Sequence, residues 1–185
     1  MNLIARRDFL LLALAVGGAR AQSGDAALVA QLRAGRCAVL WRHAQTTPGV
    51  GDPPGFSLGV CSTQRNLSTE GRAQATAAGE WFKSRALKPV AVRSSAWCRC
   101  RDTADLAFGH HEHWAALDST FGGAPDSPAR RQALMDALAR IPVGAFEVWV
   151  THQVNIGGFT GESVAMGEAV IVAPEGKVVG RSSFG

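Results

Sequence analysis

The sequence predicts an α/β fold, a three-layer α/β/α sandwich around a mostly parallel central sheet. The chain has 185 residues, of which 46% are hydrophobic, enough for one domain with a substantial core. Short apolar segments rich in β-branched residues alternate with longer segments of helical periodicity. This alternation is typical of a sheet that helices cover on both faces, and the sequence has no internal repeat.

Each expected element follows from local pattern and punctuation. Ser68 is placed to cap one helix, while Gly35 and Gly109 are placed to end two others. Between the first strand and the second helix, residues 44–64 form a Gly/Pro-rich loop, and so long a loop in a compact domain favours a functional role. The expected helices span 25–33, 68–85, 96–108 and 127–140. The expected strands span 37–42, 89–94, 114–117, 146–150 and 169–173, the last forming a hairpin with 177–180.

Residues 1–21 are expected to be a signal peptide rather than part of the domain. Arg6-Arg7 precede the short apolar run 11–16, and Ala19-Arg20-Ala21 supplies the small residues of a cleavage site. The pattern Arg-Arg-x-Phe-Leu is typical of twin-arginine export, and the apolar run is shorter than the ~20 residues that a membrane-spanning helix needs. We therefore expect cleavage after Ala21, a periplasmic mature protein without a stable membrane anchor, and the twin-arginine export machinery as a partner.

The formal net charge of +4 is mildly basic. It favours anionic small molecules as ligands, because no Lys/Arg run is dense enough to indicate nucleic acid binding.

The four cysteines are expected to meet an oxidising compartment only after export. Cys37 lies in the first strand and is expected to be a buried apolar residue. Cys61 is expected to pair with Cys98 or Cys100, and the sequence does not choose between them. A zinc site is disfavoured because Cys-x-Cys lacks the usual ligand spacing.

Two of the expected strands end in histidine. Arg42-His43 closes the first and His152 follows the fourth, and the carboxyl ends of parallel strands lie at one edge of the sheet. The helix that follows Ser94-Ser95 begins at the same edge, carries Arg99 near its start and offers free backbone N–H groups. Guanidinium groups bind phosphate oxygens bidentately, so the combination predicts a phosphate-binding crevice.

Three motifs in this order give a specific resemblance. They are Arg-His followed by Gln-Thr (42–46), Ser-Ser-x-x-x-Arg-x-x-x-Thr-Ala (94–104) and Val-Thr-His (150–152). The chain resembles the histidine phosphatase superfamily, which has the phosphoglycerate mutase-like fold. The stretch after residue 150 and the tail look most similar to an exported bacterial branch near the Ais-type lipopolysaccharide core heptose phosphatases.

The resemblance implies that His43 is the nucleophile that becomes phosphohistidine, and that Arg42, Arg99 and His152 complete the phosphate pocket. His43 must be neutral to attack, and neighbouring arginines disfavour its protonation. The superfamily usually has glycine where this chain has Ala44, which disfavours a positive φ there. No metal or cofactor is expected.

The general acid that protonates the leaving group is harder to locate. Asp118 is favoured, although it could equally cap a turn, and Glu112 and Glu162 are alternatives. Thr46 and Gln153 are expected secondary contacts of the substrate, with a structural role as the alternative for each.

The remaining arginines and histidines near the expected site are more simply interpreted as solvated surface residues than as site residues. Arg65 and Arg72 could reach an anionic substrate, but solvated positions flanking a helix are the default. His110, His111 and His113 could suggest a metal, but a solvated loop is favoured because no acid stands at ligand spacing.

The sequence therefore predicts a periplasmic phosphomonoester hydrolase that acts through phosphohistidine on a small-molecule or glycan-linked phosphate, such as a phosphorylated sugar or an envelope-linked phosphate. The alternatives are a non-catalytic phosphate-binding protein of the same fold and a phosphohistidine protein phosphatase. The loop 47–58 is expected to border the mouth of the site and shape its specificity.

Overall fold

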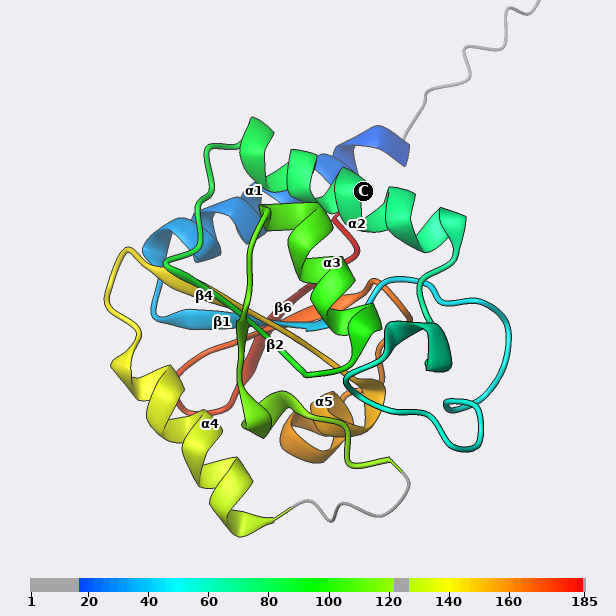
Figure 1. Ribbon diagram of the computed structural model, residues 1–185. Coiled ribbons are helices and arrows are strands. Elements are labelled where there is room, and N and C mark those ends of the chain that lie inside the picture. Colours follow the sequence, from blue (N-terminus) through cyan, green and yellow to red (C-terminus); the bar gives the residue numbers. More distant parts are fainter. Residues whose placement is uncertain (1–16, 122–126, 185) are drawn as a thin grey trace, which may run out of the picture.

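Figure 1 shows a mixed sheet enclosed between two layers of helices. The computed structural model describes residues 17–121 and 127–184, with side chains from Gly24 onward. Residues 1–16 of the predicted signal peptide lie outside the described residues, and 17–21 form the start of helix α1 (Gly17–Ala34). None of the helices in the described ranges combines the length and apolar character needed to span a membrane.

The sheet has six strands in the order β3-β2-β4-β1-β5-β6. The first four in that order are parallel, β5 is antiparallel to β1, and β6 is antiparallel to β5. The prediction of a mostly parallel sheet is thus confirmed in a mixed form. The central pair is β1 and β4, which places Arg42 opposite Thr151. The strands span Cys37–Arg42 (β1), Ala91–Ser94 (β2), Glu112–His113 (β3), Phe146–Thr151 (β4), Ala169–Val172 (β5) and Val178–Ser182 (β6).

Alternate side chains of the central strands pack into two separate hydrophobic cores, because successive side chains of a strand point to opposite faces of the sheet. Trp41 lies in the core beneath α1, α2 (Thr69–Ser84) and α3 (Cys98–Phe108). Leu40 lies in the core beneath α4 (Pro128–Arg140) and α5 (Gln153–Thr160). Figure 1 shows these two groups of helices on opposite sides of the sheet, which confirms the three-layer prediction.

The helix boundaries follow the expected local signals. The Ser68 hydroxyl accepts a hydrogen bond from the Gly71 amide at 3.1 Å, and Ser127 caps α4 in the same way. At the other end of α3, Gly109 adopts the left-handed conformation with φ of 77°, which glycine permits without steric cost.

Two sequence expectations were wrong in detail. Residues 114–117 are not a strand: β3 is the short edge segment Glu112–His113, and Ala115–Leu117 forms a 3₁₀ turn in which the Leu117 amide bonds the Trp114 carbonyl at 2.8 Å. The strand stops there because its partner β2 ends at Ser94, opposite His113. Helix α5 was not predicted because its two glycines weaken helical propensity.

Gly79 of α2 gives a test of the helix packing. A Cβ there would lie 2.3 Å from the Ala107 carbonyl oxygen of α3, so Gly79→Ala forces the two helices apart. We expect a loss of about 1–3 kcal/mol in the free energy of unfolding despite alanine's better helical propensity. Gly157→Ala in α5 is the matched control, since its nearest contact is 3.6 Å, and it should be neutral or slightly stabilising. Equal stability of both variants in urea unfolding would contradict this packing.

Candidate active site

The parallel pairing of β1 and β4 brings two histidines together. His43 and His152 directly follow these strands, and the His43 amide donates to the Thr151 carbonyl at 3.0 Å. The ring centroids lie 5.5 Å apart with planes at 67°. Both side chains are buried, so the two imidazoles share one desolvated corner at the carboxyl edge of the sheet.

The local backbone fixes the tautomer of His43. Its Nδ1 lies 2.9 Å from the Ala44 carbonyl, which can only accept, so Nδ1 carries the proton and Nε2 keeps its lone pair. Burial lowers the pKa of His43 to about 3. The hydrogen bond to the Ala44 carbonyl opposes this effect in part, and the charges of the neighbouring arginines each add a smaller lowering effect. A neutral imidazole with a free Nε2 is the form that a nucleophile requires.

Alanine after the histidine causes no backbone strain. Ala44 is fully buried and is absent from the described residues with positive φ, and its amide donates to the Thr103 hydroxyl at 3.0 Å. Position 44, which is usually glycine in the superfamily that this sequence resembles, is therefore compatible with a Cβ here.

His152 is held from the helix side of the site. Its Nε2 lies 2.8 Å from the Ser95 hydroxyl, and the Trp97 ring packs against the imidazole at a centroid distance of 5.3 Å. Burial and then the Arg99 charge lower the pKa of His152 well below its usual value. Both histidines are therefore neutral, and the positive charge of the site comes from arginines.

A pocket of about 330 Å³ opens above these histidines. Arg42, Arg65 and Arg99 line it, and the buried Nε of each has no hydrogen-bond partner among the described residues. Three guanidinium groups around one cavity whose described lining has no carboxylate indicate an anion site, because guanidinium groups bind anion oxygens. The remaining lining residues are His43, Gly49, Val50, Gly51, Ser119, Phe121, His152, Gln153, Val154 and Met166.

Asp52 orients the arginine that α3 contributes. Its Oδ1 accepts from Arg99 at 2.7 Å and from the Arg65 amide at 3.0 Å, while its Oδ2 accepts from the Trp97 indole at 3.0 Å. Burial alone raises the pKa of Asp52, but the hydrogen bonds from Arg99 and Arg65 outweigh it and hold the pKa below the usual value. The carboxylate therefore stays charged and fixes Arg99 in a buried ion pair.

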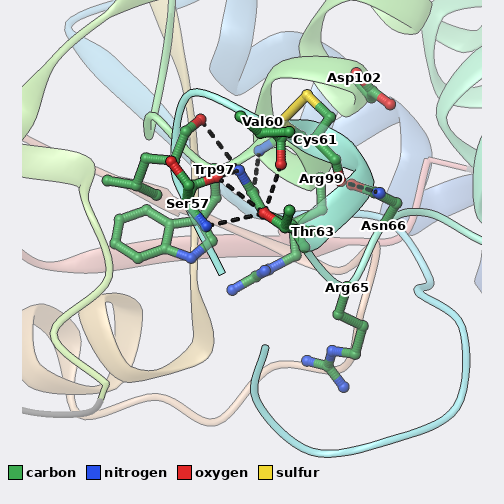
Figure 2. The surroundings of a disulfide bond; sticks show 12 residues. Ser57, Val60, Cys61, Thr63, Arg65, Asn66, Trp97, Arg99 and Asp102 are labelled. Carbon is green, nitrogen blue, oxygen red and sulfur yellow. Dashed lines mark hydrogen bonds between the residues drawn. A yellow bond between two sulfur atoms is a disulfide. The ribbon is translucent and has the colours of Figure 1, made fainter. Parts of the chain in front are cut away.

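A disulfide fastens the long loop to the first residue of α3. Cys61 is bonded to Cys98, immediately before Arg99, and Figure 2 shows the bond beside Arg65 and Arg99. The structure thus selects one of the two expected pairings and leaves Cys37 and Cys100 buried as free thiols. The Cys98 amide also donates to the Gln64 side chain at 2.9 Å, so the loop and the helix form one wall of the pocket.

Arg42 is anchored on the opposite side. Its Nη1 donates to the Val164 carbonyl at 2.8 Å and, more weakly, to the Gln153 amide oxygen at 3.4 Å. Gln153 also lines the pocket. Thr46 is buried against Met166, outside the lining of the pocket.

The structure does not bring the favoured acid into the pocket. The Asp118 carboxylate accepts from the Ala96 amide at 2.7 Å and lies 3.2 Å from His113, which matches its alternative role as a cap. The other two candidates lie elsewhere as well. Glu112 is exposed on the edge strand β3, and Glu162 pairs with Arg181 at 2.8 Å.

The remaining candidates from the sequence lie away from the pocket. Arg72 pairs with Asp102 on the surface at 3.3 Å. His111 contacts Asp105 at 2.7 Å, and His110 bonds the Phe108 carbonyl. Within the described ranges, no group of three or more His, Cys, Asp or Glu side chains is arranged to hold a metal ion.

Sequence reasoning missed the roles of Asp52 and Ser119 and undervalued Arg65. Asp52 and Arg65 belong to the irregular segment between β1 and α2, and no periodic pattern fixes its path. The only sequence signal for Arg65 was its position: it lies shortly before the helix cap Ser68, on the loop that follows His43.

Comparison with known proteins agrees with this geometry. Residues 38–122 match the model of the histidine phosphatase superfamily (branch 1). No curated protein matches the sequence. Among solved structures, SixA from Agrobacterium tumefaciens, provisionally assigned as a phosphohistidine phosphatase, superposes with a TM-score of 0.55 at 16% identity, covering 80% of this chain and 97% of that one.

Two further structures show the same fold. The protein histidine phosphatase SixA complexed with tungstate has a TM-score of 0.55 at 14% identity, covering 80% of this chain and 97% of its own. TTHB049 from Thermus thermophilus has a TM-score of 0.51 at 22% identity, covering 78% of this chain and 98% of its own. At these identities the likeness concerns the fold alone.

The disulfide should contribute measurably to stability. Its cysteines are 37 residues apart, and closing a loop of that length in the unfolded chain corresponds to about 2–4 kcal/mol. We expect Cys61→Ser/Cys98→Ser to lower the free energy of unfolding in urea by that amount. Reductant should destabilise the parent protein and leave the double variant unchanged; an equal response of both would contradict the role of this bond.

His43 should remain neutral in the ligand-free protein through mildly acidic pH. Because its folded pKa of about 3 lies below the ordinary value near 6.5, the unfolded chain binds more protons between these pH values, and this histidine's contribution to stability falls as pH falls through that window. Nitrogen-15 NMR should show the Nδ1–H tautomer from pH 8 to 5. A titration of His43 near pH 6.5 would contradict it.

Proposed function

We propose that this protein, whose residues 38–122 match the model of the histidine phosphatase superfamily, is a phosphomonoester hydrolase that works through a phosphohistidine at His43. The observation that carries the proposal is the free Nε2 of a neutral His43 at the floor of a pocket with three arginines. Phosphoryl transfer needs a positioned nucleophile and positive charge around the phosphoryl oxygens, and the pocket provides both.

The reaction has two displacements at phosphorus. In the first, His43 Nε2 forms a bond to phosphorus as the bond to the leaving oxygen breaks, while the arginines hold the phosphoryl oxygens. In the second, water attacks phosphorus, the P–N bond breaks and inorganic phosphate is released. The Ala44 carbonyl holds the Nδ1 proton throughout and stabilises positive charge on the phosphorylated ring.

The leaving group must gain a proton unless it is a stable anion. None of the described residues that line the pocket carries a carboxyl group that could donate this proton. The polar side chains of the described lining are those of the arginines, the histidines, Gln153 and Ser119. Weakly basic leaving groups should therefore react fastest. The same observation favours a second candidate function, hydrolysis of the P–N bond of phosphohistidine, which is the activity for which the SixA structures are named.

Export to the periplasm is part of the proposal, with a phosphorylated sugar or an envelope-linked phosphate as the substrate class. Its support is the twin-arginine pattern together with the Cys61–Cys98 disulfide, a bond typical of oxidising compartments. The contacts of α1 with the domain also suit cleavage after Ala21. Asp25 bonds Trp81 and Arg85, and Leu28 and Leu32 enter the core, so these contacts remain in a mature chain.

Turnover of aryl phosphates tests the proposal. We expect the mature chain to hydrolyse them in the presence of EDTA, with kcat rising steeply as the leaving phenol becomes more acidic. His43→Ala should lose at least about 1,000-fold in kcat and form no acid-labile phosphoenzyme, because the nucleophile is gone. Arg99→Lys should weaken phosphate binding, whereas Arg72→Lys on the surface serves as the control.

The outcomes separate the candidates. Activity that survives His43→Ala would overturn the mechanism. Phosphate binding without turnover of any ester or phosphoramidate would identify a binding protein. Turnover of phosphohistidine peptides with none of aryl phosphates would favour the second candidate.

A further inference from the structure

We infer that the substrate of this pocket carries its phosphate on an apolar group, such as an alkyl chain or a hydrocarbon ring. The inference rests on the proposed function, because it takes the arginine-lined pocket as the phosphate site. It concerns the mouth of the pocket, where the chemistry of the surface changes from cationic to apolar.

The mouth is bordered by apolar side chains that remain in contact with solvent. Val50, Phe121 and Val154 line the pocket while exposing 91%, 62% and 37% of their surface, and half-buried Met166 lines it beside them. We call these four residues the apolar rim. They come from four separate segments of the chain, so local sequence alone does not explain their meeting around the arginines.

Three exposed large apolar side chains from separate segments line this one pocket. Of the nine in the described part of the chain, three belong to the rim and three more lie further along the loop that carries Val50. The three loop residues are Phe56, Leu58 and Val60, and the three elsewhere are Val90, Val143 and Val179. Single exposed apolar residues need no explanation, but a gathering at the mouth of a pocket indicates a binding surface.

The loop that carries Val50 approaches Phe121 across the mouth. A Cβ built on Gly51, next to Val50, would lie 3.5 Å from Cε1 of Phe121, so the loop after β1 reaches the segment after η2 (Ala115–Leu117). A phosphoryl group bound by Arg42, Arg65 and Arg99 near His43 occupies the inner end of this pocket. Its leaving group must then leave through the outer end, past the rim.

An apolar leaving group is the occupant that this surface favours. Burying a methylene fully is worth about fourfold in affinity, and a rim that stays partly open should give about twofold. A free sugar alcohol would instead place hydroxyl groups against valine and phenylalanine. Within the proposed substrate class, the rim therefore favours an envelope-linked phosphate on an apolar carrier over a phosphorylated sugar. Continuity with the arginine-lined pocket favours the substrate itself over a separate protein partner as the molecule that covers the rim.

Binding of n-alkylphosphonates tests the inference without requiring turnover. Titration calorimetry would compare methylphosphonate with its homologues up to hexylphosphonate. We expect affinity to rise about twofold per methylene, or about 30-fold over the series. Val50→Ser/Phe121→Ser should flatten this rise. Val90→Ser/Val143→Ser, a change of exposed residues elsewhere, should keep the full rise.

A hexylphosphonate that binds no tighter than methylphosphonate would overturn the inference, and the rim would then be a candidate surface for a protein partner. A rise that persists in the rim variant would also overturn it. Failure of the proposed function is distinguishable: phosphonates would bind with the expected dependence on chain length while no phosphate compound is hydrolysed.

Discussion

The in-register parallel pairing of β1 with β4 is the constraint on which the site depends. It sets Arg42 opposite Thr151. Because His43 and His152 are the next residues of the chain, the two rings lie together at one edge of the sheet. The pairing is secured by strands buried on both sides, whose alternate residues feed two separate cores. A shift of one residue would turn these side chains toward the opposite layer, so the packing of both cores enforces the geometry of the histidines.

Charge in the pocket is unbalanced in a way that suits a dianion. Three arginines meet one carboxylate, that of Asp52, which leaves two positive charges because both histidines are neutral. A phosphate group that enters supplies the missing negative charge and offers acceptors to the guanidinium groups that line the pocket. The arginine charges that add to burial in lowering the pKa of His43 are thus the charges that would bind the phosphate group of the proposed substrate.

The regular part of the fold could be predicted from sequence because its signals are local. Hydrophobic periodicity and caps such as Ser68 located most elements within a few residues, and they brought His43 and His152 to the same edge. The third strand and α5 were missed because pairing with β2 and packing against the second core decide them, not propensity. Asp52 and Arg65 were out of reach for a related reason, since the path of the long loop depends on contacts with α3.

The Cys61–Cys98 bond also changes the covalent topology of the chain. It makes residues 61–98 a closed ring that contains Arg65, all of α2 and strand β2. A single backbone cut anywhere within that ring leaves the two fragments joined, with Arg65 and Arg99 on one covalent body. A protease that nicks an exposed turn of the ring therefore cannot release a fragment, and nicking becomes visible by electrophoresis only after reduction.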